Sequence, residues 1–287
     1  FRFELLRKNG YQAKVLTITA KEKLCLCEEM ECNPVNCPYA KGHYDRVNDA
    51  VFSLLQKEDM ITREVILEQA KEYNVCPFEM CLDTATWVDD IICDYNYVFD
   101  PNVYLKRFFA DGTTGDYIFL VDEAHNLVER SREMYSAIIY KEDFLLAKKI
   151  LKKYGQAKLM RELEKCNRVL LSYKRECEKY VIYESIGNFA FELMNVASDL
   201  DEFLQKAPEF TERKDLSEFY LNLRNFLNIY ELLDDHYVVY AEHEQDGRFK
   251  LKLYCVDPSK NLQERINKGN ATIFFSATLL PVGYYRS

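Results

Sequence analysis

Three features are missing from this chain of 287 residues, and each absence excludes something. No run of about eighteen uncharged apolar residues occurs, so we predict no membrane-spanning segment. The start lacks an initiator methionine and the apolar part of a signal peptide, which predicts a fragment of a longer protein. The nine glycines never approach the spacing G-x-x-x-x-G-K-S/T, so the chain lacks the loop whose N–H groups and lysine hold nucleotide phosphates.

The overall charge also has the wrong sign for a protein that holds nucleic acid over its whole surface, because the net charge is −9. The charge is unevenly spread. Residues 141–179 carry 12 Lys and Arg against 6 Asp and Glu, net +6, and residues 184–246 carry 4 against 15, net −11. A basic segment beside an acidic one could guide a polyanion along one side of the protein. Charged helix faces are more often solvated surface, so both interpretations stay open.

What is present begins with the motif Asp122-Glu123-Ala124-His125, directly after the apolar run 117–121. A short run of aromatic and β-branched residues predicts a buried strand. Carboxylates at its end lie where open α/β sheets place their ligand crevice. In nucleotide-hydrolysing motors the first such carboxylate holds Mg²⁺, and the second positions or activates the attacking water. A polar turn after a strand is the alternative, and the full Asp-Glu-Ala-His string favours the motor.

Cysteine is the second strong signal, because seven of the ten cysteines fall in the first third of the chain. A long, helix-rich chain without a signal segment is not a secreted disulfide scaffold. In a reducing compartment such clustering indicates a metal or cluster site. The seven are Cys25, Cys27, Cys32, Cys37, Cys76, Cys81 and Cys93.

Four of these cysteines have a spacing that does not match a zinc ribbon. Six, four and thirty-eight residues separate Cys25, Cys32, Cys37 and Cys76, whereas a zinc ribbon has two close pairs. Four thiolates are the usual holder of an iron–sulfur cluster. Cys27 competes with Cys25, and Cys81 with Cys76. The remaining cysteines are expected to be buried thiols, namely Cys93, Cys166, Cys177 and Cys255.

The hydrophobic pattern predicts an α/β sheet whose strands are interrupted by two inserts. With 48% hydrophobic residues the chain is expected to fold, and its length allows about two domains. A helix should end at Asn9-Gly10. The predicted strands are 13–19, a largely buried 87–93, 117–121 and 271–275.

The first insert is cysteine-rich, and the second is helical for roughly a hundred residues from about residue 132 to 235. Asp246-Gly247 is expected to turn a hairpin. Helical segments are predicted near 46–57 and 63–73 in the first insert, and over 144–154, 163–173, 189–204 and 216–233 in the second. The hairpin strands are 237–242 and 249–255.

Six strings in their order along the chain resemble the XPD/DinG-type DNA helicases, the iron–sulfur branch of superfamily 2. The strings are Lys23-Leu24-Cys25, the stretch 32–42, Val75-Cys76-Pro77-Phe78-Glu79, the segment 94–101, Asp122-Glu123-Ala124-His125-Asn126-Leu127 and Phe275-Ser276-Ala277-Thr278-Leu279. The resemblance implies a partial RecA-like parallel-sheet motor domain made of residues 1–24, 84–131 and 249–287. It implies an iron–sulfur domain at 25–83 and an all-helical Arch at 132–248.

The resemblance also implies site residues and ligands. A [4Fe–4S] cluster is expected on Cys25, Cys32, Cys37 and Cys76, and Mg-ATP on Asp122 and Glu123 in the longer protein. Asp122 would bind Mg²⁺, Glu123 would activate water, and His125 would link the site to Ser276 and Thr278. Candidate DNA contacts are Lys21, Lys23, Lys41, Arg46 and Phe78, by phosphate pairing or base stacking. Core packing is an equal alternative for Phe78.

The implied function is an ATP-dependent DNA helicase of DNA repair or replication that moves 5′ to 3′ on single-stranded or forked DNA. The expected protein is a cytoplasmic monomer with no membrane partner. The missing phosphate loop, and a missing second motor domain with its arginine finger, predict that this chain alone neither hydrolyses ATP nor unwinds DNA.

Two other functions compete with the helicase. One is a zinc- or redox-sensing DNA-binding protein without motor activity, in which the acidic motif is vestigial. The other is a nuclease, which ranks last because no cluster of carboxylates suits a two-metal site.

Overall fold

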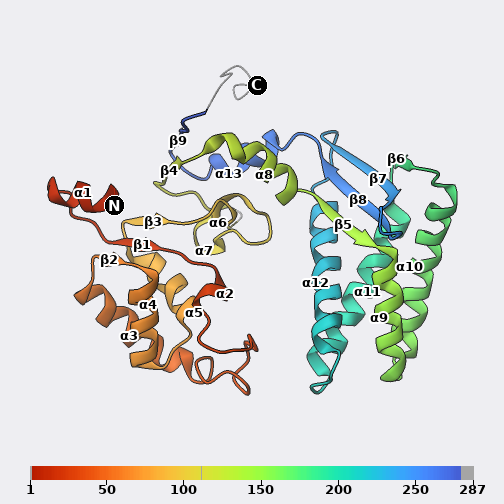
Figure 1. The fold of residues 1–287 in the computed structure, drawn as a ribbon, viewed down its shortest axis with the longest axis horizontal. Helices are drawn as coiled ribbons and strands as arrows, with labels where there is room; N and C mark the ends of the chain where they lie inside the picture. Colours follow the sequence, from red (N-terminus) through yellow and green to blue (C-terminus); the bar gives the residue numbers. More distant parts are fainter. Residues whose placement is uncertain (1, 111, 279–287) are drawn as a thin grey trace. The chain divides into compact units, whose positions relative to one another are not determined.

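The computed structural model describes residues 2–110 and 112–278, which belong to two compact units, Phe1–Tyr97 and Val98–Ser287 (Figure 1). Each unit combines helices with a parallel ladder of strands, which confirms the predicted α/β class. Among the described helices, none is both long and apolar enough to cross a membrane, as predicted.

The first unit is built on a three-stranded parallel ladder in the order β2-β1-β3. The central strand β1 (Val15–Thr17) lies within the predicted strand 13–19 and is almost wholly buried. The predicted preceding helix is α1 (Arg2–Lys8), and Gly10 follows it with a φ of +92° that favours glycine. Sequence patterning missed β2 (Met60–Ile61), because two residues are too few to show a period.

The third strand of this ladder differs from its prediction. β3 covers only Asp90–Ile92, and its side chains are half-buried or exposed. Trp87 lies outside it, in the short 3₁₀ helix η1 (Ala85–Trp87), and is 69% exposed. The prediction of a largely buried strand over residues 87–93 is therefore wrong, because η1 continues directly from the preceding helix and shortens the strand.

The chain between β1 and β3 forms a small helical layer. Both predicted helices are confirmed, and their apolar sides pack together with Val47, Leu54 and Ile66 fully or almost fully buried. Gln69 Nε2 donates to the Ala50 carbonyl (2.9 Å) in the interior of this layer. The helices are α2 (Lys21–Leu24), α3 (His43–Lys57), α4 (Arg63–Tyr73) and α5 (Pro77–Thr84).

The second unit contains a two-stranded parallel ladder of β4 (Ile118–Val121) and β9 (Ala271–Phe274). Both strands lie where they were predicted. The prediction that the first is buried is wrong, because Ile118 is 66% exposed and Leu120 is 64% exposed. Ile118 and Leu120 are two residues apart and so share one face of the ladder, and the described residues leave that face largely uncovered. The short helices of the second unit are α7 (Lys106–Phe109), η2 (Ala124–Asn126), α8 (Leu127–Met134) and α13 (Ser259–Ile266). Helix α6 (Asn96–Phe99) spans the boundary between the two units.

The rest of the second unit joins four long helices to a four-stranded antiparallel sheet, β5-β8-β7-β6. The helices match the four amphipathic runs, and the hairpin of β7 and β8 turns at Gly247, whose φ is +88°. The helices are α9 (Lys141–Lys153), α10 (Ala157–Glu176), α11 (Gly187–Lys206) and α12 (Arg213–Tyr230). The strands are β5 (Ala137–Tyr140), β6 (Tyr180–Tyr183), β7 (Tyr237–His243) and β8 (Phe249–Cys255).

The prediction of an all-helical insert is thus wrong at β5 and β6. Each is a run of only four apolar residues beside a long helix, so the helical period on either side masks it. Figure 1 shows the four helices side by side with the strands at their upper end. Their common core includes Phe144, Leu163, Leu193 and Phe226, each completely out of solvent.

Candidate functional site

The acidic motif lies where two parallel strands end together. β4 leads into Asp122-Glu123, and β9 leads into Ser276-Ala277-Thr278. The backbone continues the pairing beyond the strands, because Phe275 N–H donates to the Val121 carbonyl (3.0 Å) and Ala124 N–H donates to the Phe275 carbonyl (3.1 Å). Two motifs that are about 150 residues apart in sequence are therefore held side by side.

The side chains of the two motifs form one hydrogen-bonded network. Ser276 Oγ donates to Glu123 Oε2 (3.0 Å) and lies 2.8 Å from His125 Nδ1. His125 Nδ1 is also 3.2 Å from Glu123 Oε2 and 3.2 Å from Thr278 Oγ1. Every donor has an acceptor when His125 Nδ1–H donates to the Ser276 oxygen and the Ser276 hydroxyl donates to the Glu123 carboxylate. The structure thus brings together four of the five predicted catalytic residues.

The backbone at Glu123 has an uncommon conformation. Its φ of +49° and ψ of +41° are left-handed, a region that L-residues other than glycine, Asn and Asp enter at a cost of about 1–2 kcal/mol. The fifth predicted residue supports this turn, because Asp122 Oδ1 accepts the Glu123 N–H (2.9 Å). Such strain persists where the surroundings demand it, and here it accompanies the contact of the Glu123 carboxylate with Ser276.

This end of the ladder has the chemistry that a hydrolytic nucleotide site needs. Glu123 is 56% exposed at its side chain, so solvent and ligands can reach the carboxylate. Adjacent carboxylates at the carboxyl end of parallel strands offer oxygen ligands to a hard cation and a base for water. The site also contains a polar relay from the carboxylate to β9, through Ser276.

The predicted cluster cysteines lie in the loop after α2 and at the start of α5. Cys25 is the C-terminal cap of α2, and Cys76 is the N-terminal cap of α5. Cys27 Sγ is 3.8 Å from Cys37 Sγ. Burial and the neighbouring thiols of Cys37 and Cys25 raise the pKa of Cys27 to about 11, and either thiol can donate in this contact.

The groups around Cys76 act on its pKa in both directions, and burial, the Glu79 carboxylate and Cys37 together raise the pKa of the Cys76 thiol. The backbone N–H groups of Phe78 and Glu79, in the first turn of α5, donate to the sulfur and act against burial. The amine of Lys21 donates a hydrogen bond to the sulfur of Cys32 and also interacts electrostatically with Cys76. Lys21 therefore brings a positive charge close to two of the predicted ligands.

One residue of this region had no sequence signal as a site residue. His43 is buried, and its Nδ1 accepts the backbone N–H of Cys76 (3.2 Å), which orients the cap of α5. Burial lowers the pKa of His43 and favours the neutral acceptor that this bond requires. His43 and Cys76 are 33 residues apart, so only the folded chain shows the pairing.

The distances between the thiols decide what they could hold. Tetrahedral zinc with Zn–S bonds of about 2.3 Å needs sulfurs about 3.8 Å apart throughout. In the described part of the chain, no three cysteine sulfurs lie within 4.8 Å of one another. The thiols as placed therefore do not form a single-zinc site, and soft sulfur donors are also what an iron–sulfur cluster uses.

The other cysteines are thiols packed among apolar groups. Cys81 is completely buried in α5, and its burial raises its pKa to about 12. Burial has the same effect on Cys93, although this residue keeps part of its surface exposed. The predicted burial of Cys166, Cys177 and Cys255 is confirmed.

The predicted DNA contacts separate into two groups. Lys21 lies over the ring of the half-buried Phe78, with its amine 5.7 Å from the ring centroid, beside the cluster cysteines. Lys23 and Lys41 are exposed. Arg46 instead braces the insert, because its guanidinium donates to the carbonyls of Lys41 (2.8 Å), Tyr73 (3.1 Å) and Asn74 (2.6 Å).

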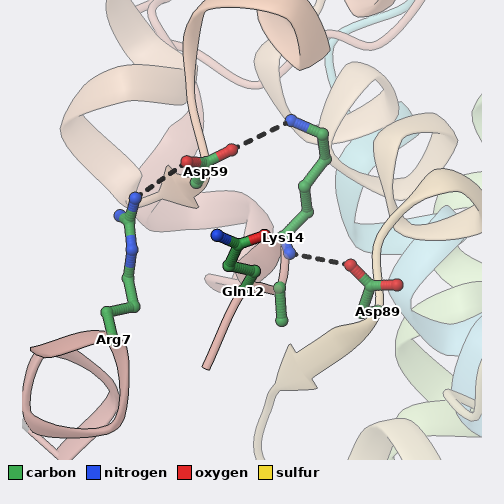
Figure 2. Close-up of a pocket in the computed structure, with 6 residues that line it drawn as sticks. Arg7, Gln12, Lys14, Asp59 and Asp89 are labelled. Atoms are coloured by element: carbon green, nitrogen blue, oxygen red, sulfur yellow. Dashed lines mark hydrogen bonds and ion pairs between the residues drawn. The ribbon is translucent and has the colours of Figure 1, made fainter. Parts of the chain in front are cut away.

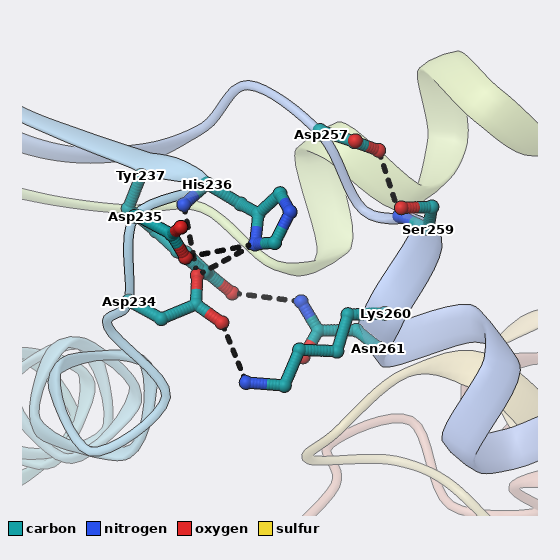
Figure 3. A network of polar contacts seen from close by, with 8 residues as sticks. All are labelled: Asp234, Asp235, His236, Tyr237, Asp257, Ser259, Lys260 and Asn261. Carbon is teal, nitrogen blue, oxygen red and sulfur yellow. Dashed lines mark hydrogen bonds and ion pairs between the residues drawn. The ribbon is translucent and has the colours of Figure 1, made fainter. Parts of the chain in front are cut away.

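Two other polar sites are explained by the fold. A cleft of about 330 Å³ in the first unit places Arg7 and Lys14 near each other, yet both pair with Asp59, at 2.7 and 3.2 Å (Figure 2). Figure 3 shows Asp234, Asp235 and His236 at the start of β7. Asp234 accepts bonds from His236 and from Lys260 Nζ (2.7 Å), so this network fastens α13 to the hairpin.

Comparison with known proteins places these observations in a family context. Residues 8–144 match the DEAD_2 family. The regulator of telomere elongation helicase 1 homolog of Anopheles gambiae is 26% identical over 128 residues, which are 44% of this chain and 12% of that protein. The chain thus spans about an eighth of the curated relative's length.

Two solved structures show the same fold. A truncated XPD superimposes with a TM-score of 0.55 at 19% identity, over 99% of this chain and 78% of that one. An XPD helicase does so with a TM-score of 0.50 at 18% identity, over 95% of this chain and 47% of that one. The family model, the curated relative and the two solved structures point to the same family of proteins.

Proposed function

We propose, from the premise that the chain is an XPD/DinG-like superfamily 2 helicase sequence, that it is the central part of an ATP-dependent DNA helicase. One observation carries the proposal. The hydrogen-bonded network of Glu123, His125 and Ser276 joins an acidic motif to a hydroxyl motif at the ends of two parallel strands. That arrangement suits a machine in which nucleotide hydrolysis must be transmitted to a second element.

In the longer protein Asp122 would hold the Mg²⁺ of bound Mg-ATP. The nucleotide would supply the γ-phosphate, and the Mg²⁺ would neutralise phosphate charge. Glu123 accepts the proton of the attacking water. The hydroxyl of Ser276 donates to Oε2 of this carboxylate in the present structure, so protonation of Glu123 would weaken the bond between them. The release of Ser276 would move β9 and the residues that follow it, which couples hydrolysis to the grip on DNA.

Cys25, Cys32, Cys37 and Cys76 would hold a [4Fe–4S] cluster, and Cys27 would donate a hydrogen bond to a ligand sulfur. The cluster would supply folding free energy to residues 25–83, which bury little apolar surface in the loop between α2 and α3. Ten cysteines and such a cluster suit a reducing compartment, and we propose the cytoplasm.

We propose that Lys21, Lys23, Lys41 and Phe78 contact DNA. Arg46 is left out of this set, because its guanidinium already donates to three backbone carbonyls. We further propose that the longer protein moves from 5′ to 3′ on single-stranded or forked DNA. It would act as a monomer in DNA repair or replication. The second insert would serve as an Arch. We extend its proposed bounds to 132–255, because β8 pairs with both β5 and β7 and a boundary at residue 248 would cut that sheet.

The proposed function can be tested by measuring DNA binding and ATP hydrolysis with the purified chain of 287 residues. We expect anaerobically purified protein to bind a fluorescent oligothymidine with an affinity that falls as salt rises. We expect no ATP hydrolysis above background with or without DNA, since no phosphate-cradling loop is present. Absence of DNA binding by cluster-loaded protein overturns the proposed function. DNA-stimulated hydrolysis overturns the proposed inactivity of the chain alone.

The rival function, a zinc- or redox-sensing DNA-binding protein, has one observation in its favour. The sulfurs of Cys27 and Cys37 are close enough for a disulfide to form with small movements. This rival function does not explain the hydrogen-bonded network of Glu123 and Ser276, so we rank it second.

A further inference from the structure

Helix α10 carries a row of cations along its outer face. Five exposed Lys and Arg side chains follow one another at intervals of three, four or seven residues, so they lie on one side of the helix. Three of them, Arg161, Arg168 and Arg175, are seven residues apart and stand almost in line, about 10.5 Å from one to the next. We call these three the arginine ridge. The five are Lys158, Arg161, Lys165, Arg168 and Arg175.

The opposite face of α10 accounts for how the helix is anchored. Leu159, Leu163, Cys166 and Leu170 are buried in the core of the second unit. Their packing fixes the rotation of α10 about its axis. The ridge is therefore turned towards solvent by the same contacts that stabilise the helix.

Neighbouring helices neutralise both sides of α10 but not the ridge. On the side of α9, Lys148 pairs with Glu164. On the side of α11, Lys158 pairs with Asp199 and Lys165 lies 3.8 Å from Glu192. Two carboxylates of the acidic segment 184–246 thus pair with Lys158 and Lys165.

The arginines keep their charge. Within the described residues, no carboxylate oxygen lies within 4.0 Å of the guanidinium nitrogens of Arg161, Arg168 or Arg175. Among the described residues, the one hydrogen bond of these side chains is a long contact of 3.4 Å from Arg168 Nε to the Glu164 carbonyl. The three arginines therefore form no ion pair in this part of the chain, although the Glu164 carboxylate acts on Arg168 electrostatically, and their Cα atoms line up along the helix.

We propose that the arginine ridge binds the phosphodiester backbone of single-stranded DNA. Guanidinium forks bind phosphates in a bidentate manner, and a straight row of three suits a chain of regularly spaced anions. The ridge is about 21 Å long from first to last arginine, which spans several nucleotides of an extended strand. This inference rests on the proposed function, because the ligand is the same DNA, and it adds a contact surface apart from the cluster cysteines and the acidic motif.

The test uses the full chain with its cluster and a fluorescent oligothymidine in a series of salt concentrations. The ridge variant is Arg161→Gln, Arg168→Gln and Arg175→Gln combined. The matched control is Lys206→Gln, Lys214→Gln and Arg224→Gln, which removes the same charge from exposed positions of α11 and α12. Circular dichroism and iron content verify that both variants fold.

The slope of log affinity against log salt gives the answer. Each phosphate contact on a single strand contributes about 0.7 to that slope, so the ridge variant should lose about 2, with affinity about tenfold lower or more at low salt. The control should keep the slope of the unmodified chain. An unchanged slope in the ridge variant, with the unmodified chain binding DNA, overturns the inference and leaves the proposed function standing. No binding by the unmodified chain overturns the proposed function itself.

A final arm distinguishes DNA from an acidic protein. Unlabelled oligothymidine should compete for the ridge far better than polyglutamate of equal total charge. Equal competition, lost in the ridge variant, would overturn the assignment to DNA and identify the ridge as a site for an acidic peptide.

Discussion

Replacement of Glu123 by glutamine is expected to lower DNA-stimulated ATP hydrolysis by about 10²–10⁴-fold in a protein that contains this chain and a phosphate-binding loop. The change keeps the size of the side chain and its contact with Ser276, and removes only the ability to accept a proton. The KM for ATP should stay within a few-fold, because the proposed Mg²⁺ ligand is Asp122. Steady-state kinetics at saturating DNA measures both quantities.

Glu129→Gln is the matched control for this variant. Glu129 lies in the next helix, α8, and its exposed carboxylate pairs with Arg132 rather than with the motif. Its replacement should leave hydrolysis unchanged. If Glu123→Gln also left the rate unchanged, or acted only through the KM, Glu123 would not be the base.

Replacement of Cys76 by serine is expected to lower iron from about four atoms per chain to near zero. Cys76 is a predicted ligand at the start of α5, where the N–H groups of Phe78 and Glu79 are aimed at its sulfur. Loss of the cluster should also loosen the loop between α2 and α3, measured as faster amide hydrogen exchange there. Cys93→Ser serves as the control, because Cys93 is a partly buried thiol outside the predicted ligand set.

Two further serine variants decide between neighbouring candidates in the loop. Cys32→Ser should remove the iron as Cys76→Ser does, and Cys27→Ser should keep it. The Lys21 amine hydrogen-bonds to the sulfur of Cys32, whereas Cys27 Sγ lies 3.8 Å from the sulfur of the predicted ligand Cys37. The reverse result would exchange the two residues in the ligand set.

The long amphipathic helices were predictable from the sequence, whereas the short strands were not. α4 occupies the predicted span 63–73, because eleven residues show a helical period clearly. β6, with four residues after a helix of twenty, has a period too short to compete with its neighbour. The exposure of Ile118 was unpredictable for another reason, since burial of a strand side chain depends on what packs against that face of the sheet.

For the candidate site, residue types were predictable and contacts were not. The motif at Asp122 and the hydroxyls at Ser276 and Thr278 stood out as strings, but their meeting depends on the parallel register of β4 with β9. His43 had no signal, because its link to Cys76 exists only after α3 and α5 have packed. The charge imbalance of residues 141–179 was visible in the sequence. Only the salt bridges to α9 and α11 show which cations stay unneutralised.

The most direct test of the account is the iron and acid-labile sulfide content of the unmodified chain after anaerobic purification. The account predicts about four of each per chain and broad absorbance at about 400 nm, because the cluster proposed on Cys25, Cys32, Cys37 and Cys76 contains four irons and four sulfides. One zinc per chain with no iron would contradict it and favour the zinc-sensing rival.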